Sequence, residues 1–357
     1  MRLPEHGANC ARLYESLNIP VPEKILDFSE NCNPAGPPVV VKEAWADLLS
    51  TITSYPDPDG QPFRAVAAKF HQVEERCVLV GNGAAELLSL LGECYRGEKV
   101  LLIDPTFSEY RATLEASGAE VVSIQAKEED DFRLPVAQIV DALPKVAAVY
   151  LCTPNNPTGI LPTLDELLTI VQAAERSRTE VVLDEAFIDF VDESRSFIHH
   201  LEKYPHVIVV RSMTKMYAIP GIRLGYLVTH PEIVSMVKSR TPHWHVNGVA
   251  AEIGALCLNE RSYCESAILH AQTERAKMVE FLRAYDCQVI DSVANYLIFA
   301  PKQDARVLYR YLLARGIVLR HSENFRGMDG RWLRVGMKSA EQMNSLREAM
   351  ANWFEEQ

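Results

Sequence analysis

Between about residues 75 and 235, short apolar runs alternate with stretches in which apolar residues recur at helical spacing. Apolar runs of four to eight residues predict buried strands, and the helical segments 84–95 and 164–177 lie between several of them. This alternation favours parallel strands joined by helical crossovers. The predicted strands are 99–104, 120–124, 146–152, 180–186, 206–210 and 225–228.

After about residue 240 the pattern changes to a long helical region, 247–284, followed by three apolar runs and a closing helix from 339. The runs are 295–300, 316–321 and 332–337, which predict a second, α+β unit. The proline-rich stretch 33–38 favours extended or turn structure. We therefore expect an α/β protein. Residues 41–245 are expected to form a large domain with a mostly parallel sheet in an α/β/α sandwich. Residues 1–40 would form an arm and part of a small domain, and residues 246–357 would form the rest of that small domain.

Composition narrows the classes of protein. The 357 residues carry a formal net charge of −12, which repels nucleic acid unless a basic patch overrides it, and the chain has no basic run. No apolar run approaches 18 residues, so we expect no membrane span, and the start lacks the layout of a signal or transit peptide, which favours the cytoplasm. The 8 cysteines form no CxxC pair, so neither a disulfide scaffold nor a zinc ribbon is indicated.

Glycine, amide, carboxylate or lysine residues follow four of the apolar runs, at the strand ends where parallel sheets place their ligand sites. After 77–81, Gly83 and Ala84 permit close backbone approach, and the next helix offers unpaired N–H groups to an anion. Glu86 occupies the third position of the G-x-G-x-x-G pattern, so a dinucleotide fingerprint is not met. Taken alone, this loop predicts a turn.

The next two run ends carry an amide and a carboxylate. In "TPNNPTG" (153–159), two prolines stiffen a turn that carries Asn155 and Asn156. Asp184 emerges directly from an apolar run, where a buried carboxylate needs a cationic partner. A protonated ring nitrogen is one such partner, and an arginine of the protein is another.

The fourth run end, "RSMTK" (211–215), supplies two hydroxyls and a lysine. Ser212 and Thr214, with Arg223 nearby, suit a phosphate. A lysine near cations and partly removed from water loses its proton more readily, so Lys215 could form a Schiff base with an aldehyde. Taken together, the four run ends offer a site for an anion, an amide for a polar ring, a carboxylate for a pyridinium and a lysine for an aldehyde. Pyridoxal phosphate is a ligand that carries all four of these groups.

At this point a family resemblance appears. The motifs "GNGAAE", "TPNNPTG", "DEAFIDF" and "SMTK" with Arg223 resemble fold-type I pyridoxal-phosphate enzymes of the histidinol-phosphate aminotransferase group. Within that group, "HGAN", "LDFSENCNPAGPP" and "RSMTKMYAIPGIRLGYLV" are similar to threonine-phosphate decarboxylases of cobalamin synthesis. The resemblance implies a homodimer that binds pyridoxal 5'-phosphate and converts O-phospho-L-threonine to (R)-1-aminopropan-2-yl phosphate with release of carbon dioxide.

The resemblance also implies residue roles. Lys215 would hold the cofactor and Asp184 would keep its ring nitrogen protonated, which makes these two the candidate catalytic residues. Asn156 would bond the ring hydroxyl, and Phe107 would stack on the ring. The candidate contacts of the cofactor phosphate are Gly83, Ala84, Ser212, Thr214 and Arg223, with Tyr55 from the partner subunit. The candidate substrate contacts are His6, Asn31, Asn156, Arg320 and Arg334.

Several alternatives stay open. Aminotransferases of this group usually carry tyrosine where this chain has Phe187, which favours the decarboxylase. Transamination of histidinol phosphate or an aromatic amino acid is the alternative activity, and phosphoserine is an alternative substrate. A cofactor-binding sensor without turnover is a different class of function. Metal chemistry at His243 and His245 with Cys257 and Cys264 is another, although their irregular spacing favours ordinary packing.

Overall fold

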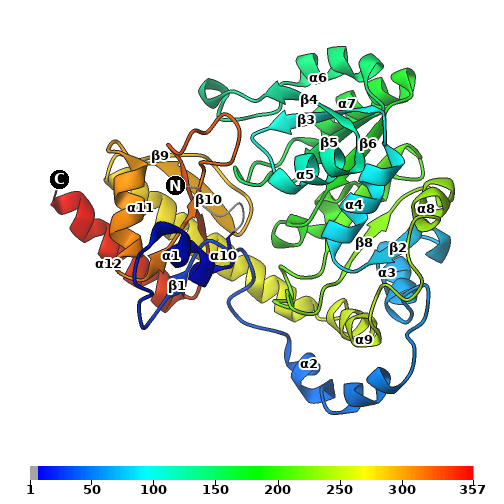
Figure 1. The fold of residues 1–357 in the computed structure, drawn as a ribbon, viewed down its shortest axis with the longest axis horizontal. Helices are drawn as coiled ribbons and strands as arrows, with labels where there is room; N and C mark the ends of the chain where they lie inside the picture. The colour runs from blue at the N-terminus through cyan, green and yellow to red at the C-terminus, as the bar shows by residue number, and fades with distance from the viewer. Residues whose placement is uncertain (1–6, 357) are drawn as a thin grey trace.

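The computed structural model describes residues 7–356, and its larger part is built on a seven-stranded sheet (Figure 1). The strand order is β2-β8-β7-β6-β5-β3-β4, and the five strands from β7 to β4 are parallel, whereas β8 runs antiparallel to both of its neighbours. The predicted α/β class with a mostly parallel sheet is confirmed. The bounds are β2 (Val78–Gly81), β3 (Lys99–Asp104), β4 (Glu120–Gln125), β5 (Ala148–Cys152), β6 (Glu180–Asp184), β7 (Val207–Ser212) and β8 (Gly225–Val228).

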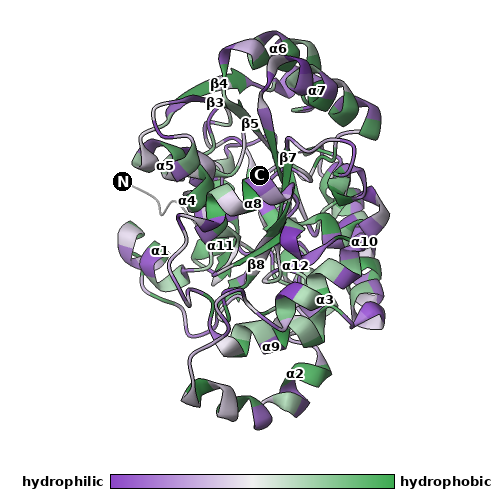
Figure 2. Ribbon diagram, turned by 90° about the vertical axis from the view of Figure 1, so that its right-hand side faces the viewer, coloured by the Kyte–Doolittle hydropathy of each residue, from purple (hydrophilic) through white to green (hydrophobic). Residues whose placement is uncertain are grey.

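Two hydrophobic cores cover the two faces of this sheet. In β3, Val100 and Leu102 belong to one core while Leu101 and Ile103 belong to the other, because successive strand side chains point to opposite faces. Figure 2 shows the central strands as strongly hydrophobic. One core packs α4 (Ala84–Cys94), α5 (Ser108–Ser117) and α8 (Pro231–Lys238), and the other packs α2 (Val39–Ala44), α3 (Phe63–His71), α6 (Val136–Ala142), α7 (Leu164–Ser177) and α9 (Gly248–Cys257).

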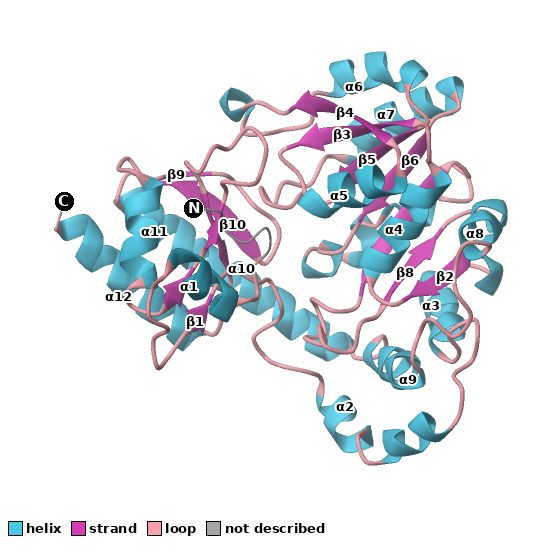
Figure 3. Ribbon diagram, in the orientation of Figure 1, coloured by secondary structure: helices cyan, strands magenta, loops and turns pink. Residues whose placement is uncertain are grey.

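A smaller unit with its own core lies beside the first (Figure 3). It contains the sheet β12-β13-β10-β9 and the parallel pair β1-β11. Its strands are β1 (Leu26–Asp27), β9 (Gln288–Val289), β10 (Tyr296–Ala300), β11 (Ile317–Val318), β12 (Arg320–His321) and β13 (Leu333–Gly336). Its helices are α1 (Cys10–Leu17), α10 (Arg261–Ala284), α11 (Ala305–Leu313) and α12 (Ala340–Glu355).

Two expected elements are divided. The helical region 247–284 is two helices, because the chain leaves helical geometry at Glu260, whose φ of −85° and ψ of 63° separate α9 from α10. The apolar run 316–321 forms two short strands, since β11 pairs with β1 while β12 pairs with β13 in a different sheet. The predicted boundary at residue 245 stays a prediction, and α9 just after it packs into the core of the large sheet. No helix within residues 7–356 is long and apolar enough to cross a membrane.

Candidate active site

A cavity of about 270 Å³ lies at the carboxyl edge of the large sheet, facing the small unit. Parallel strands end at one edge, so β5, β6 and β7 deliver their following residues to the same place. The predicted residues that line the cavity are Asn31, Ala84, Phe107, Asn156, Asp184, Ser212, Thr214, Lys215, Arg223, Arg320 and Arg334. Gly83 and Tyr55 do not line the cavity, and His6 lies outside the described residues.

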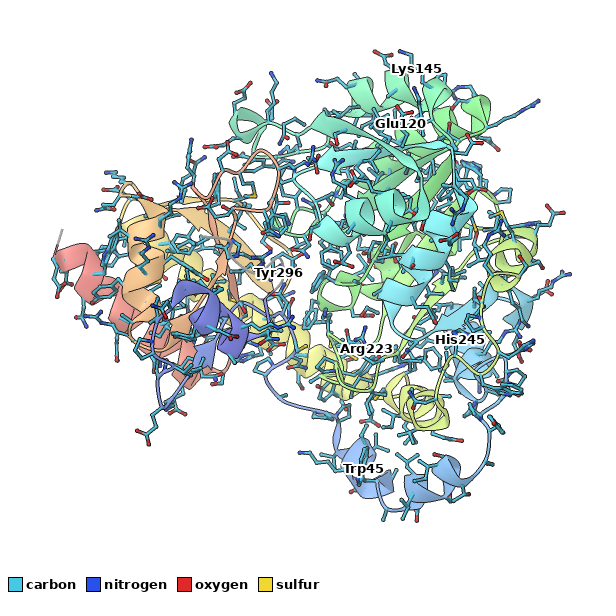
Figure 4. All side chains as sticks on the ribbon, viewed as in Figure 1. Trp45, Glu120, Lys145, Arg223, His245 and Tyr296 are labelled. Carbon is cyan, nitrogen blue, oxygen red and sulfur yellow. The ribbon has the colours of Figure 1, made fainter. Side chains whose placement is uncertain are left out.

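One end of the cavity is built for an anion. Helix α4 begins after Gly83, which has φ of 82° and provides no side-chain cap, so the first N–H groups of the helix are left for a ligand. A Cβ at Gly83 would lie 2.5 Å from Arg223 Nη2 and would displace this guanidinium, and the positive φ itself favours glycine here. Ser212 Oγ lies 2.9 Å from Thr214 Oγ1 on the same side. Figure 4 shows Arg223 close to where the two units meet.

Asp184 is a buried carboxylate at the end of β6. The hydroxyl of Tyr110 donates to its Oδ2 at 2.5 Å, and the N–H of Ala186 donates to its Oδ1 at 3.0 Å. Burial raises the pKa of Asp184, and these two hydrogen bonds oppose the rise. A cation placed beside Asp184 would lower this pKa, so the site is suited to a protonated ring nitrogen.

Arg334 joins the two units inside the cavity. Its Nη1 donates to Oδ1 of Asn156 at 2.5 Å, and its Nη2 donates to the carbonyl oxygen of Ser29 at 2.6 Å. Within the described residues, Arg334 Nε and Asn31 Oδ1 are buried without a hydrogen-bond partner. Buried polar atoms of this kind are costly unless a ligand satisfies them, which indicates a polar substrate here.

Arg320 is the second buried cation of the cavity. Its Nη2 donates to Asn324 Oδ1 at 2.7 Å, and its guanidinium lies 5.1 Å from the ring centre of Phe325. Burial and the neighbouring Arg334 lower the pKa of Arg320 to about 9, and burial lowers the pKa of Arg334 to about 10. Two cations that oppose each other in a buried cavity favour a ligand with two anionic groups.

Lys215 and two aromatic rings complete the lining. Lys215 follows β7 and is half-buried, with its carbonyl oxygen accepting a hydrogen bond from Asn33 N–H at 2.9 Å. Phe107 also lines the cavity and meets the ring of Tyr110 edge-on at 5.5 Å. Phe187 packs edge-on against Tyr296 at 4.9 Å and brings no hydroxyl to the site.

Sequence reasoning missed Tyr110 and Ser29. Tyr110 lies three positions after Phe107, in the first turn of α5, and this helical spacing was the available signal for a second aromatic residue at the site. Ser29 contributes a backbone carbonyl, which no side-chain pattern reveals. In the described part of the chain, no group of three or more His, Cys, Asp or Glu residues could hold a metal ion, and His245 instead contacts Glu86.

Comparison with known proteins agrees with this geometry. The family model for aminotransferase class I and II matches residues 23–350. The threonine-phosphate decarboxylase of Salmonella typhimurium is 36% identical over 354 residues, which cover 97% of this chain and 96% of that protein. A histidinol-phosphate aminotransferase of Desulfitobacterium hafniense is 33% identical, over 95% of this chain and 94% of that protein.

A solved structure is similar along nearly the whole chain. The crystal structure of the histidinol-phosphate aminotransferase from Clostridium acetobutylicum superimposes with a TM-score of 0.89 at 28% identity, over 93% of this chain and 100% of that one. The fold, the family model and the relatives agree. The chain therefore belongs to the aminotransferase class I and II family.

Proposed function

We propose that this protein is a pyridoxal-phosphate-dependent decarboxylase that converts O-phospho-L-threonine to (R)-1-aminopropan-2-yl phosphate and carbon dioxide, in cobalamin biosynthesis. The observation that carries the proposal is the pair of buried arginines, Arg320 and Arg334, in the cavity that Lys215 lines. A phosphorylated amino acid has two anionic groups, one for each cation. The relative from Salmonella typhimurium supports the same activity.

The residues present fit pyridoxal phosphate. The uncapped start of α4, with Arg223, Ser212 and Thr214, would hold the phosphate, because N–H groups, hydroxyls and a guanidinium are the usual phosphate donors. Asp184 would pair with the ring nitrogen, as the burial of its carboxylate requires a cation.

The remaining cofactor contacts concern the ring and the aldehyde. Asn156 would donate to the ring hydroxyl, Phe107 would stack on the ring, and Lys215 would bind the aldehyde carbon. When bound, the cofactor withdraws electrons from the α-carbon of the substrate, so that a bond at this carbon can break.

The side chains of the chain decide which bond that is. Arg334, and Asn31 through its Nδ2, would bind the substrate carboxylate, and Arg320 would bind the substrate phosphate, so these side chains would fix the orientation of the bonds at the α-carbon. The α-carbon would lose carbon dioxide, and Lys215, as a general acid, would supply the proton that replaces it. His6, which lies outside the described residues, stays a predicted substrate contact.

Transamination is the alternative, because histidinol-phosphate aminotransferases are also relatives. Phe187 favours decarboxylation, since it supplies no hydroxyl beside the cofactor ring. The test is incubation of the purified enzyme with O-phospho-L-threonine, with carbon dioxide and 2-oxo acid both measured. Carbon dioxide without 2-oxo acid supports the proposal, and amine transfer to a 2-oxo acid as the main activity would overturn it.

Phosphoserine differs from phosphothreonine by one methyl group. A hydrophobic pocket separates two such substrates by only about 1–3 kcal/mol. We propose phosphothreonine as the preferred substrate, and the ratio of kcat/KM for the two phosphoamino acids tests this preference directly. A higher kcat/KM for phosphoserine would assign the enzyme to that substrate.

The proposal includes a homodimer in the cytoplasm. Large apolar side chains are exposed together along 39–55, where Trp45 is 58%, Leu49 67% and Ile52 66% exposed. Exposed apolar patches of this kind mark protein interfaces, and Figure 4 places Trp45 at the lower edge of the molecule. Tyr55, 81% exposed in the same segment, would reach the cofactor phosphate of the partner subunit.

A further inference from the structure

Behind the start of α4, on the side away from the cavity, Glu86 and His245 form a close polar pair. His245 Nδ1 lies 2.7 Å from Glu86 Oε2, and the same oxygen accepts the backbone N–H of Asn82 at 2.7 Å. Neither Glu86 nor His245 lines the cavity, while Ala84 and Ala85 do. The pair therefore supports the turn that precedes the helix and does not touch the ligand.

The turn that Glu86 holds shapes the anion site. Gly83 follows Asn82 with φ of 82°, and its N–H donates to the carbonyl of Gly81 at 2.7 Å. By binding Asn82 N–H, Glu86 fixes the peptide that leads into Gly83 and so fixes the direction of the helical N–H groups that follow. A small rotation of this turn would move those groups away from a bound phosphate.

The charge of Glu86 makes its partner necessary. Glu86 is a carboxylate in the first turn of α4, the same helix start that would bind the phosphate dianion from its other side, and two negative groups repel each other. Burial works against the charge of Glu86, but hydrogen bonds from His245 and Asn82 outweigh it and lower the pKa of the carboxyl. A hydrogen-bond donor at position 245 therefore keeps Glu86 in place and reduces the repulsion between its carboxylate and a bound phosphate.

The loop that carries His245 is strained. Trp244 has φ of 56°, a conformation that is costly for a large side chain, and its ring lies 4.9 Å from that of Tyr55. Trp244 thus contacts Tyr55, which is proposed to reach the cofactor phosphate of the partner subunit. The next residue, His245, contacts Glu86, which supports the phosphate site of its own subunit. Figure 4 shows His245 near α3, on the side of the large unit that faces away from the small one.

We propose that His245 is a positioning residue for the cofactor phosphate, which acts through Glu86 to hold the Asn82–Gly83 turn and to offset the negative charge behind it. The inference rests on the proposed cofactor and is independent of which reaction the enzyme performs. It also gives His245, which the sequence offered as a metal ligand, a role that requires no metal.

The test compares pyridoxal 5'-phosphate with pyridoxal, which lacks the phosphate, in equilibrium binding to the full-length apoprotein. We expect His245→Leu to weaken pyridoxal 5'-phosphate binding about 10-fold, because one charge-assisted hydrogen bond behind the phosphate site is lost. Binding of pyridoxal should change less than about 2-fold. His245→Asn, which keeps an N–H donor near the Nδ1 position, should restore most of the affinity. His243→Leu is the matched control, because His243 is the exposed histidine of the same loop.

A second comparison isolates the charge. Glu86→Gln added to His245→Leu should recover part of the lost affinity, because it removes the unpaired carboxylate. Equal loss for both ligands, or no loss, would overturn the proposal. If the leucine variant does not fold, His245→Ala carries the same ligand comparison. Failure of the unaltered protein to bind pyridoxal 5'-phosphate would instead refute the proposed function.

Discussion

Arg334 donates a hydrogen bond of 2.5 Å from Nη1 to Oδ1 of Asn156, across 178 positions of the sequence. The bond joins β13 of the small unit to the turn after β5 of the large sheet. The bond fixes which way the amide of Asn156 points and leaves its Nδ2 to donate to the proposed cofactor ring. One contact thus links the side chain that would bind the substrate carboxylate to the side chain that would bind the cofactor.

Replacement of Arg334 by lysine should weaken substrate binding. Lysine keeps the charge, but its three donors share one compact nitrogen and cannot span Asn156, Ser29 and a carboxylate as the guanidinium does. We therefore expect KM for O-phospho-L-threonine to rise about 100-fold. Steady-state release of carbon dioxide measures this. Arg331→Lys is the control, since Arg331 belongs to the same segment but pairs with Glu128 on the surface. An unchanged KM would remove Arg334 from the substrate site.

Replacement of Lys215 by alanine should abolish the covalent link to the cofactor. We expect the visible absorbance of the bound cofactor to shift to that of the free aldehyde, and turnover to fall by at least about 1,000-fold, because Lys215 is also the proposed general acid. Absorbance spectra and carbon dioxide release check both effects. Lys145→Ala, at an exposed lysine that Figure 4 shows well away from Arg223, should change neither. Full turnover by the Lys215 variant would contradict the assignment.

Replacement of Tyr110 by phenylalanine should shift the pH dependence of the reaction. The Tyr110 hydroxyl opposes the rise in the pKa of Asp184 that burial causes, so its loss raises this pKa further. Asp184 then becomes protonated at higher pH, and the acid limb of kcat/KM should move upward. The profile of kcat/KM against pH measures this. Tyr150→Phe removes another buried hydroxyl that does not bond to Asp184 and should leave the limb in place.

Replacement of Glu185 by glutamine should remove a pH-dependent loss of stability. Burial raises the pKa of Glu185 from 4.5 to about 7, so between these values the folded state keeps a proton that the unfolded state has lost. Stability from this group is therefore present below pH 4.5 and is lost as the pH rises to 7. At about 1.4 kcal/mol per pH unit, the variant should gain on the order of 3 kcal/mol relative to the parent between pH 4.5 and 8.

Urea unfolding across this pH range measures the difference between the two proteins. Glu202→Gln, at an exposed glutamate, is the control and should show no such trend. A constant difference between the Glu185 variant and its parent across the range would contradict the prediction.

Paired substitutions Leu49→Glu and Ile52→Glu should disrupt the proposed homodimer. Two carboxylates in an apolar interface lose their hydration without gaining a partner, so the dimer dissociation constant should rise by about 100-fold or more. Analytical ultracentrifugation checks this. Val307→Glu, at an exposed apolar residue of α11 in the small unit, should leave the assembly unchanged. A dimer that persists in the paired variant would place the interface elsewhere.

The apolar pattern alone determined the parallel part of the large sheet and the edge at which the site lies. Asn156, Asp184 and Lys215 could be found because each lies at or just after the end of a buried strand, and parallel strands end together. The roles of Arg320 and Arg334 came from the family resemblance, since no local pattern connects them to that edge. The division of 316–321 between two sheets could not be predicted, because it depends on the partner strands.

Tertiary structure decided which residues meet. Tyr110 reaches Asp184 across 74 positions, and His245 reaches Glu86 across 159. Hydrophobic periodicity shows only whether a side chain faces the core. It does not show which distant side chain will become its contact partner. The sequence by itself therefore determined the chemical groups at the strand ends. The hydrogen bonds that orient Asp184, Asn156 and Glu86 exist only because the packing of helices and sheets brings their distant partners within reach.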